Sequence, residues 1–275
     1  MSTTATANDP LTREALLRRA CALRLHGLAE HLDEIDDDAL AQLHTWLGWE
    51  ERTRAERGLA RRLGAAHLGR FKALVDYDWA FPESVDRAGI NELMGLGFME
   101  NAGNVVIVGP NGVGKTTIAQ NIAHAAVLGG HTALFVTASA ALADLAERDS
   151  DAALRRRLRR YTTPQLLVID EIGYLSYATR QADLLFEIIS QRYESKPTIV
   201  TTNRPFAEWG EVFPNAACVT SLIDRLTHHA EIVQIDGDSW RRHEADERAA
   251  AKKKRRPGGT TTKGAKGRGT SGSSS

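Results

Sequence analysis

The chain has 275 residues, 42% of them hydrophobic, which suffices for one medium-sized domain with a smaller appendage and excludes disorder throughout. Lys and Arg balance Asp and Glu at 35 each, but eight of the basic residues lie in 252–275, where no acid occurs, so residues 1–251 hold 27 basic against 35 acidic side chains. No apolar run approaches the roughly 20 residues of a membrane helix, and Cys21 and Cys218 lack metal-ligand spacing, so we expect a cytoplasmic protein with no membrane partner.

The N-terminal quarter of the chain has the pattern of helices. Leucines and other apolar residues recur at three- and four-residue steps after Pro10, and a second helical run extends from about residue 39 to 68. We therefore predict a small helical domain over 1–70 that binds DNA or a partner protein. Residues 71–103 mix short apolar pieces with Pro82 and glycines, which predicts a linker, and no strand is expected before residue 100.

From residue 104 onward, short apolar runs alternate with helical stretches. Five such runs are "NVVIV", "TALFVT", "QLLVID", "TIVTTN" and "EIVQID". This alternation predicts an α/β fold over 104–250 with a parallel sheet flanked by helices, and it places ligands at the carboxyl ends of the strands. The last segment, 251–275, is rich in Gly, Ser, Thr and Lys, so we expect a disordered basic tail.

The stretch "GPNGVGKTT" predicts a phosphate-binding loop, because a β-branched strand precedes it and a helical pattern follows it. Its glycines let the backbone amides approach phosphate oxygens, and the helix N-terminus adds positive potential. Lys115 is expected to reach the β- and γ-phosphates, and the Thr116 hydroxyl is expected on Mg²⁺. The predicted nucleotide-binding residues are Gly109, Pro110, Asn111, Gly112, Val113, Gly114, Lys115, Thr116, Thr117 and Asp170.

Two acids close the apolar run "LLVIDE". Asp170 stands at the predicted strand end, where a carboxylate can hold a water of the Mg²⁺ shell, and Glu171 can orient and deprotonate an attacking water. A helix-capping acidic turn is the other interpretation of such a pair. The combination with a phosphate loop favours hydrolysis of ATP in the presence of Mg²⁺.

Two later residues complete the predicted catalytic set with Glu171. Asn203 ends the run "TIVTTN" and is expected to hold the attacking water, although an Asn in this position is often only a turn residue. Arg225 lies in "SLIDRLTHH", on a helix that turns Leu222, Ile223 and Leu226 inward. Its guanidinium is then free to point at a neighbouring subunit's nucleotide as an arginine finger, or to pair with a nearby acid.

The order of these motifs resembles a known family. "GPNGVGKTT", "LFVTASAALADL", "LLVIDEIGYLS", "TIVTTNRPFAEW" and "LIDRLTHHAEIVQI" resemble the IstB-like ATP-binding proteins, AAA+ helper ATPases of insertion-sequence transposition that are related to helicase loaders. The resemblance spans about 11–243, since "FKALVDYDW" is also similar to the family's linker. Thr117 after "GKT" and the "PNGV" filling of the loop depart from the family pattern but keep its glycines.

The resemblance implies an ATP-driven assembly on duplex DNA that recruits the transposase of the same mobile element. It implies a homo-oligomer with nucleotide at the subunit interfaces. In the family's terms Lys115 and Thr116 match Walker A, Asp170 and Glu171 match Walker B, Asn203 matches sensor 1, and Arg225 matches the finger.

DNA contacts must come from local basic clusters, because the acidic balance of residues 1–251 makes the whole body a poor nonspecific binder. The predicted DNA-binding residues are Arg155, Arg156, Arg157, Arg159 and Arg160 in "RRRLRR"; the alternative is a solvated helix face paired with Glu147, Asp149 and Asp151. A second cluster spans residues 52–62 and is diluted by acids. The basic tail is expected to add affinity without selectivity.

Three other functions remain open at this stage. A helicase loader has the same motifs and would bind a hexameric helicase. A small-molecule kinase needs an acceptor pocket and a lid, and no insertion after Asn203 provides one. A binding module that uses ATP only as an assembly clamp would show slow turnover.

Overall fold

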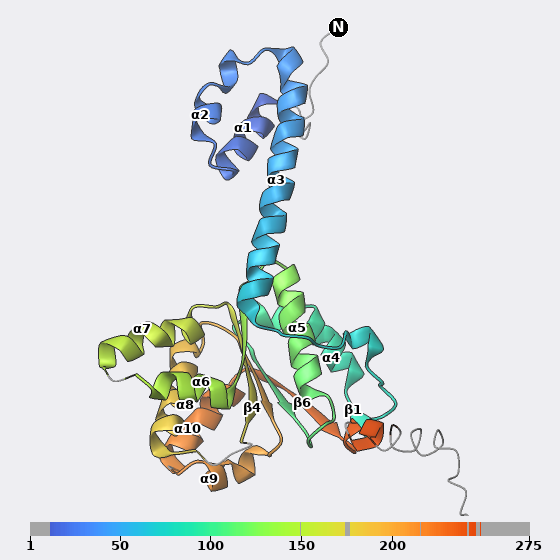
Figure 1. Cartoon of the computed structure of the whole chain (residues 1–275), viewed down its shortest axis with the longest axis vertical. Helices are drawn as coiled ribbons and strands as arrows, with labels where there is room; N and C mark the ends of the chain where they lie inside the picture. Colours follow the sequence, from blue (N-terminus) through green and yellow to red (C-terminus); the bar gives the residue numbers. More distant parts are fainter. Residues whose placement is uncertain are drawn as a thin grey trace, which may run out of the picture.

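The computed structural model describes residues 12–148, 150–173, 177–214, 216–240, 242–245 and 248, of which the side chains of 216 and 217 are not described. A small helical head is joined to a larger α/β body by one long helix, the stalk (Figure 1). The basic tail predicted over 251–275 lies outside the described residues. None of the helices in these ranges combines the length and apolarity that a membrane crossing needs.

The head consists of α1 (Arg13–Ala22), α2 (His26–Glu30), the 3₁₀ turn η1 (Leu32–Glu34) and the first half of α3 (Asp37–Ala66). Its core is made of leucines, namely Leu16, Leu23, Leu32, Leu40, Leu43 and Leu47. Both long helices begin at side-chain caps: Thr12 accepts from the Ala15 amide and Asp36 accepts from the Ala39 amide. The 30-residue α3 therefore starts in the head and continues into the body.

The segment 71–103, predicted as a linker, packs as part of the body. It contains η2 (Leu74–Asp76), β1 (Ser84–Val85), α4 (Arg87–Met94) and η3 (Gly97–Met99), and its residues Ile90, Leu93 and Phe98 are buried. β1 pairs antiparallel with the last strand, although no strand was expected before residue 100. A two-residue strand has no measurable alternation, so the sequence pattern carries no sign of it.

The five predicted strands form one parallel sheet. They are β2 (Asn104–Val108), β3 (Ala133–Thr137), β4 (Leu166–Ile172), β5 (Thr198–Thr202) and β6 (Ala230–Asp236). With the antiparallel β1 at one edge, the sheet has six strands in the order β1-β6-β2-β5-β4-β3. The connecting helices are α5 (Lys115–Leu128), α6 (Ala138–Ala146), α7 (Asp151–Thr162), α8 (Thr179–Arg192), α9 (Trp209–Val212) and α10 (Ala216–Thr227), with the 3₁₀ turn η4 (Phe206–Glu208) before α9. The predicted fold class, a parallel sheet flanked by helices after a helical N-terminal domain, is confirmed.

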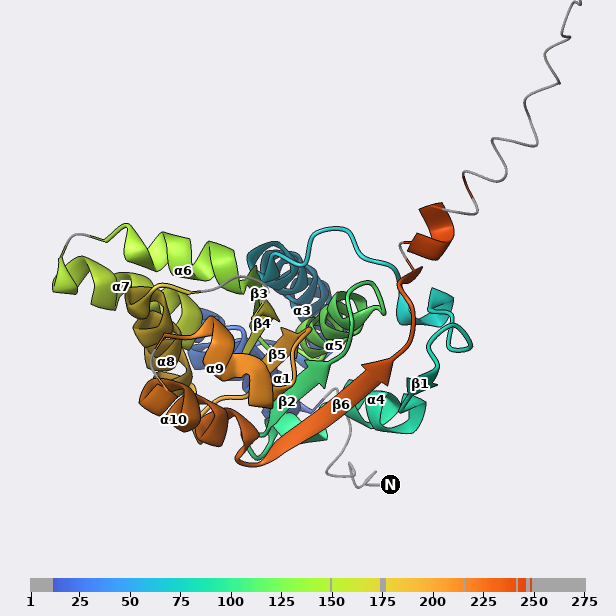
Figure 2. The ribbon, with the colours of Figure 1, turned by 90° about the horizontal axis from the view of Figure 1, so that it is seen from below.

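Helices cover both faces of this sheet, as the view from below shows (Figure 2). In β4, Leu167 and Ile169 pack with α6, α8 and α10, whereas Leu166 and Val168 pack with α4, α5 and the end of α3. Alternate strand residues thus enter two separate cores, which is why the central strands read as continuous apolar runs. Because β5 lies between β2 and β4 in the sheet, the carboxyl ends of these three strands are neighbours.

A buried arginine joins several segments at the other end of the sheet, where β4 and β5 begin. Arg192, 1% exposed, donates to the carbonyl oxygens of Tyr161, Pro164, Gln165 and Pro197 and to the Thr198 hydroxyl. Burial lowers the pKa of this guanidinium to about 9, so it is still protonated at neutral pH. One side chain therefore joins the end of α7, the end of α8 and the entries to β4 and β5.

Candidate nucleotide-binding site

The loop between β2 and α5 has the backbone that a phosphate cradle requires. Gly112 and Gly114 have φ angles of 89° and 99°, a region that side chains with a Cβ rarely adopt. A Cβ on Gly112 would meet the Ser239 side chain, and one on Gly114 would lie 2.5 Å from a ring carbon of Tyr77. The loop is therefore packed closely from outside by two segments distant in sequence, and its glycines cannot be replaced without displacing them.

Lys115 is the first residue of α5 and is 7% exposed. Its ammonium donates to the carbonyl oxygens of Gly109 at 2.6 Å and Pro110 at 2.7 Å, and so spans the loop from the inside. Of the predicted nucleotide-binding residues, Asn111, Gly112, Val113, Gly114, Lys115, Thr116 and Thr117 line one pocket, whereas Gly109, Pro110 and Asp170 are not among its lining residues.

Asp170, near the end of β4, is brought against the loop by the sheet. The Thr116 hydroxyl lies 3.1 Å from both of its carboxylate oxygens, and the Thr201 hydroxyl of β5 donates to Oδ1 at 2.5 Å. Asp170 is 3% exposed, and this burial raises its pKa, although the hydrogen bonds from Thr201 and Thr116 act in the opposite direction. The sheet thus brings into contact the two side chains that the sequence analysis assigned to Mg²⁺.

Glu171 follows Asp170 directly, but its side chain points in a different direction from that of Asp170, because the β4–β5 register shifts between Ile169 and Ile172. Glu171 has a φ of 62°, which is unusual for a residue with a Cβ, and its amide donates to the Thr201 hydroxyl at 2.9 Å. This irregularity leaves Asp170 inside and turns Glu171 to the exposed side, where it lines the pocket. Irregular backbone of this kind is common beside active sites.

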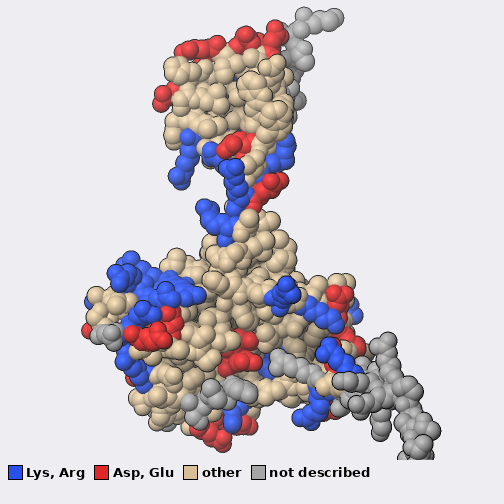
Figure 3. Space-filling model, in the orientation of Figure 1, with Lys and Arg blue, Asp and Glu red and all other residues tan. Residues whose placement is uncertain are grey.

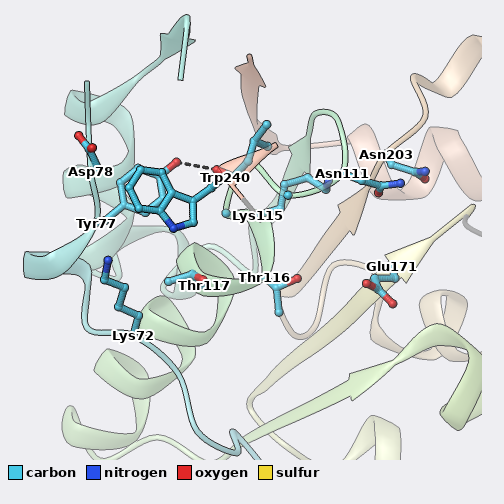
Figure 4. A pocket seen from close by; sticks show the side chains of 13 residues that line it. Lys72, Tyr77, Asp78, Asn111, Lys115, Thr116, Thr117, Glu171, Asn203 and Trp240 are labelled. Carbon is cyan, nitrogen blue, oxygen red and sulfur yellow. Dashed lines mark hydrogen bonds between the residues drawn. The ribbon is translucent and has the colours of Figure 1, made fainter. Parts of the chain in front are cut away.

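Asn203 follows β5, the strand between β2 and β4, so it enters the same pocket as Glu171 from the neighbouring strand (Figure 4). Its side-chain oxygen is buried and has no hydrogen-bond partner among the described residues. A buried amide oxygen without a partner costs free energy unless a water or ligand satisfies it. The two residues predicted to act on water therefore share one cavity with the phosphate loop.

The far end of the pocket is formed by residues that the sequence analysis did not assign. Lys72, Tyr77, Asp78 and Trp240 line it, and in Figure 4 they lie on the side of the phosphate loop away from Glu171 and Asn203. The Tyr77 hydroxyl donates to the Val113 carbonyl at 2.7 Å, and the Lys72 ammonium lies 5.6 Å from the centre of the Trp240 ring. Lys72, Tyr77 and Asp78 lie in "FKALVDYDW", for which the sequence analysis found a family resemblance but no role. Trp240 follows β6, where no sequence motif indicated a binding residue.

Trp240 is tied to the phosphate loop by its backbone. Its amide donates to the Gly112 carbonyl at 3.1 Å, and the preceding Ser239 touches the same glycine. The ring packs edge-on against Phe81 at 4.8 Å and lies 5.6 Å from the His243 ring. This aromatic cluster fixes the chain after β6 over the outer side of the loop.

Arg225 lies far from this pocket in its own chain. Its carbonyl accepts from the Asn104 side chain at 3.2 Å, at the start of β2, whereas the phosphate loop follows the end of β2. The guanidinium donates to the Ser190 hydroxyl and lies 4.6 Å from the Phe186 ring centre. The expectation of an unattached side chain is therefore wrong, because α8 supplies partners for it, and the expected pairing with an acid is absent among the described residues.

The basic helix α7 pairs with an acid that the sequence analysis did not consider; of the acids that it did consider, Asp149 lies outside the described residues. Arg157 donates to Asp144 of α6 at 2.6 Å, and Arg160 lies 3.8 Å from the same carboxylate. Arg155, Arg156 and Arg159 are exposed and have no hydrogen bond or ion pair with a described residue. The five arginines therefore divide into two that hold α7 on α6 and three that face solvent.

The residues present fit a Mg²⁺ nucleoside triphosphate. Hard cations of this size take oxygen ligands and keep several waters, and the Thr116 hydroxyl and Asp170 carboxylate offer such oxygens beside the loop. The loop amides and the N-terminus of α5 favour an anion, and the Asn203 oxygen, which has no hydrogen-bond partner among the described residues, can accept a hydrogen bond from water. Thr116 and Asp170 would hold the cation, which would neutralise charge on the phosphates.

Comparison with known proteins gives the family. The family model described as IstB-like ATP binding protein matches residues 18–248. An ATP-binding protein of insertion sequence IS21 from Pseudomonas aeruginosa is 35% identical over 84% of this chain and 89% of its own length. A counterpart in insertion sequence IS5376 from Geobacillus stearothermophilus is 37% identical over 63% of this chain and 69% of its own.

Solved structures show the same AAA+ fold. The crystal structure of DnaI matches with a TM-score of 0.51 at 19% identity, over 59% of this chain and 90% of that one. AMPPCP-bound DnaA from Aquifex aeolicus matches with a TM-score of 0.52 at 17% identity, over 68% of this chain and 56% of that one. At these identities the likeness concerns the fold alone. The sequence relationship is closer, and by it the chain belongs to the IstB-like ATP-binding proteins of insertion sequences.

Proposed function

We propose that this protein hydrolyses ATP as the helper of a transposase on duplex DNA. The observation that carries the proposal is the convergence of Glu171 and Asn203, from two adjacent strands, on the pocket that the phosphate loop lines. A protein that only stores nucleotide has no need of an acid and an unpartnered amide oxygen beside the γ-phosphate position.

In this proposal the triphosphate lies along the loop amides, with Lys115 at the β- and γ-phosphates. Glu171 accepts a proton from a water that the Asn203 oxygen holds, and that water attacks the γ-phosphorus as the bond to the β-phosphate oxygen breaks. Mg²⁺, when bound, neutralises negative charge on the phosphate oxygens. The base then lies toward Tyr77 and Trp240, whose rings offer apolar faces to it.

Arg225 acts in trans in this proposal. It lies at the entry end of β2, about 16 Å of strand away from the loop in the same chain at 3.3 Å per residue. A second subunit must therefore supply the finger, so hydrolysis requires a homo-oligomer with nucleotide at its interfaces. Ser190 and Phe186 hold the guanidinium at the surface where that subunit docks.

The exposed arginines of α7 are the proposed DNA contacts, and a transposase encoded by the same mobile element is the proposed partner. Family membership supports the assignment to insertion sequences. Proteins that act on chromosomal or element DNA work in the cytoplasm of a bacterium, where we place this one.

The test is the rate of ATP hydrolysis with and without duplex DNA, with Lys115→Ala as the blank. We expect duplex DNA to stimulate the wild-type rate and to leave the blank unchanged. A rate indifferent to DNA overturns the coupling and favours an ATP clamp or a kinase. Co-purification with the transposase rather than with a replicative helicase separates a transposition helper from a helicase loader.

A further inference from the structure

Basic side chains surround the notch between the head and the body. Figure 3 shows Lys and Arg on the underside of the head, along the stalk and on the α7 side of the body, while acids cap the far end of the head. We use the name basic notch for six exposed arginines that have no hydrogen bond or ion pair with a described residue: Arg24 after α1, Arg57 and Arg61 on α3, and Arg155, Arg156 and Arg159 on α7. Only the last three belong to the cluster already assigned to DNA.

The stalk presents its arginines away from α5. Arg62 donates to the Val127 carbonyl of α5, and Ala66 is fully buried against the same helix, so these two residues mark the face of α3 that meets the body. Arg57 and Arg61 are four residues apart and share another face, whose centre is about 140° around the helix from that of Arg62 and Ala66 at 100° per residue. They therefore face the open side of the stalk.

The head is polarised along its long axis. α1 and α3 are antiparallel, because Arg13 at the start of α1 pairs with Asp37 at 2.7 Å, whereas the Leu23 carbonyl after α1 accepts from Arg54. Asp36, Asp37 and Asp38 lie at the first of these two ends, where Figure 3 shows acids over the surface of the head. The acids near the other end, Glu50 and Glu51, pair with Arg54 and Arg19. Arg24 follows Leu23 and so lies at the other end, over the notch.

α7 forms the floor of the notch. Its apolar residues Leu158 and Tyr161 are buried against the body, and Asp144 neutralises Arg157 on the same side. Arg155, Arg156 and Arg159 are turned outward. Figures 1 and 2 agree that α7 and the stalk stand apart across the notch rather than one behind the other.

Arg57 and Arg61 lie one turn apart on the stalk, and Arg155 and Arg159 lie one turn apart on α7; like-charge pairs at this spacing repel each other, so a bound anion would stabilise both. The stretch of α3 from Leu47 in the head core to Leu59 at the body core is twelve residues, or about 18 Å of helix. That separation is comparable with the width of a nucleic-acid duplex. A small anion would reach only one wall of the notch.

We propose that duplex DNA lies in the basic notch, with phosphates contacted by α7 and by Arg57 and Arg61 of the stalk together. The inference rests on the proposed function, and it adds that the head and the body hold one duplex jointly. The contacts are guanidinium groups toward the phosphate backbone, which positions DNA without reading its sequence. DNA held in this way couples the orientation of the head to the ATP-binding body.

The test uses the full chain and measures duplex affinity as a function of salt, because each phosphate contact contributes about 0.9 to the slope of log K against log salt. We expect Arg57→Ala/Arg61→Ala to lower the slope by about 2, equally for duplexes of different sequence. Arg155→Ala/Arg159→Ala is expected to lower it by a similar amount, and the combined variant by the sum. The matched control is Arg87→Ala/Arg248→Ala, which removes two exposed arginines outside the notch.

The outcomes separate the two proposals. If Arg57→Ala/Arg61→Ala has the same salt slope as the wild-type protein, and the wild-type protein binds duplex DNA, then the stalk does not contact the duplex. That result overturns the proposal of a shared notch and makes the stalk a surface for an acidic protein. Equal loss of slope in the control variant also overturns it, since the effect is then one of net charge. Absence of duplex binding by the wild-type protein overturns the proposed function itself. Unchanged ATP binding in every variant verifies that each protein is folded.

Discussion

Thr201 connects the two acids of the site. Its hydroxyl donates to Asp170 Oδ1 at 2.5 Å and accepts from the Glu171 amide at 2.9 Å, so one side chain on β5 fixes both the buried and the exposed acid of β4. The Thr201 hydroxyl is therefore the hydrogen-bond acceptor for the backbone amide of Glu171, where the strand is irregular. The separation of the two roles, one acid toward the cation and one toward water, depends on this contact.

Thr201→Val is expected to lower ATPase activity by about 10- to 100-fold, the usual effect of losing the hydrogen bond that orients a metal-site carboxylate. Thr201→Ser keeps the hydroxyl and should recover most of the rate. The control is Thr202→Val, which removes the neighbouring hydroxyl; within the described part of the chain its hydrogen bonds go to the backbone of Arg204. Steady-state kinetics checks this, and equal losses in the two valine variants would show a merely structural role.

Glu171→Gln is expected to bind ATP normally and to hydrolyse it about 10²- to 10⁴-fold more slowly, because the amide cannot accept the proton of the attacking water. Glu187→Gln on the exposed side of α8 serves as the control and should keep the wild-type rate. Single-turnover hydrolysis and equilibrium binding of a fluorescent ATP analogue separate the two steps. Unchanged turnover would remove Glu171 from the mechanism.

Arg225→Ala is expected to bind ATP but to be nearly inactive alone, since each subunit lacks the finger for its neighbour. Mixing it with Glu171→Gln should restore part of the activity. At some interfaces the Arg225→Ala subunit then supplies an intact pocket and the Glu171→Gln subunit supplies an intact arginine finger. The measurement is ATPase rate against mixing ratio. A flat curve at all ratios would contradict action in trans.

Trp240→Ala is expected to weaken ATP binding by about 5- to 100-fold, as stacking of a base on an aromatic ring contributes about 1–3 kcal/mol. Trp49→Ala in the head, where the ring is 56% exposed, is the control and should leave the affinity unchanged. Titration calorimetry gives both affinities. If a Trp240→Phe variant binds no better than Trp240→Ala, the ring does not contact the base.

Asp144→Asn is expected to destabilise the protein by about 1–3 kcal/mol at neutral pH, because charge-assisted hydrogen bonds from Arg157 and Tyr161 are lost. Burial raises the pKa of Asp144, but these hydrogen bonds outweigh it and hold the pKa below its ordinary value of 3.8. The contribution is therefore present above about pH 4 and is lost as pH falls through the folded-state pKa. Thermal unfolding at pH 7 and pH 3 should show the difference between the two proteins shrinking; a constant difference would contradict this.

The local parts of the site follow from the sequence because they are contiguous. The phosphate loop, the strand before it and the helix after it occupy residues 105–128, so their glycines, β-branched residues and helical period are visible without any tertiary contact. The same holds for the apolar strand that ends in Asp170 and Glu171. A parallel sheet follows from the alternation of such strands with helices.

The contacts between distant segments were decided only by the tertiary structure. Thr201, Tyr77 and Trp240 received no role from the sequence, and they reach the site because β5 lies between β2 and β4 and because 72–78 and 239–240 fold over the loop. The partner of Arg157 is Asp144 rather than the nearer acids, since helix packing and not sequence distance selects it. Strand order, strand register and helix docking are decided by many weak packing interactions between distant segments. A local sequence pattern does not show these interactions.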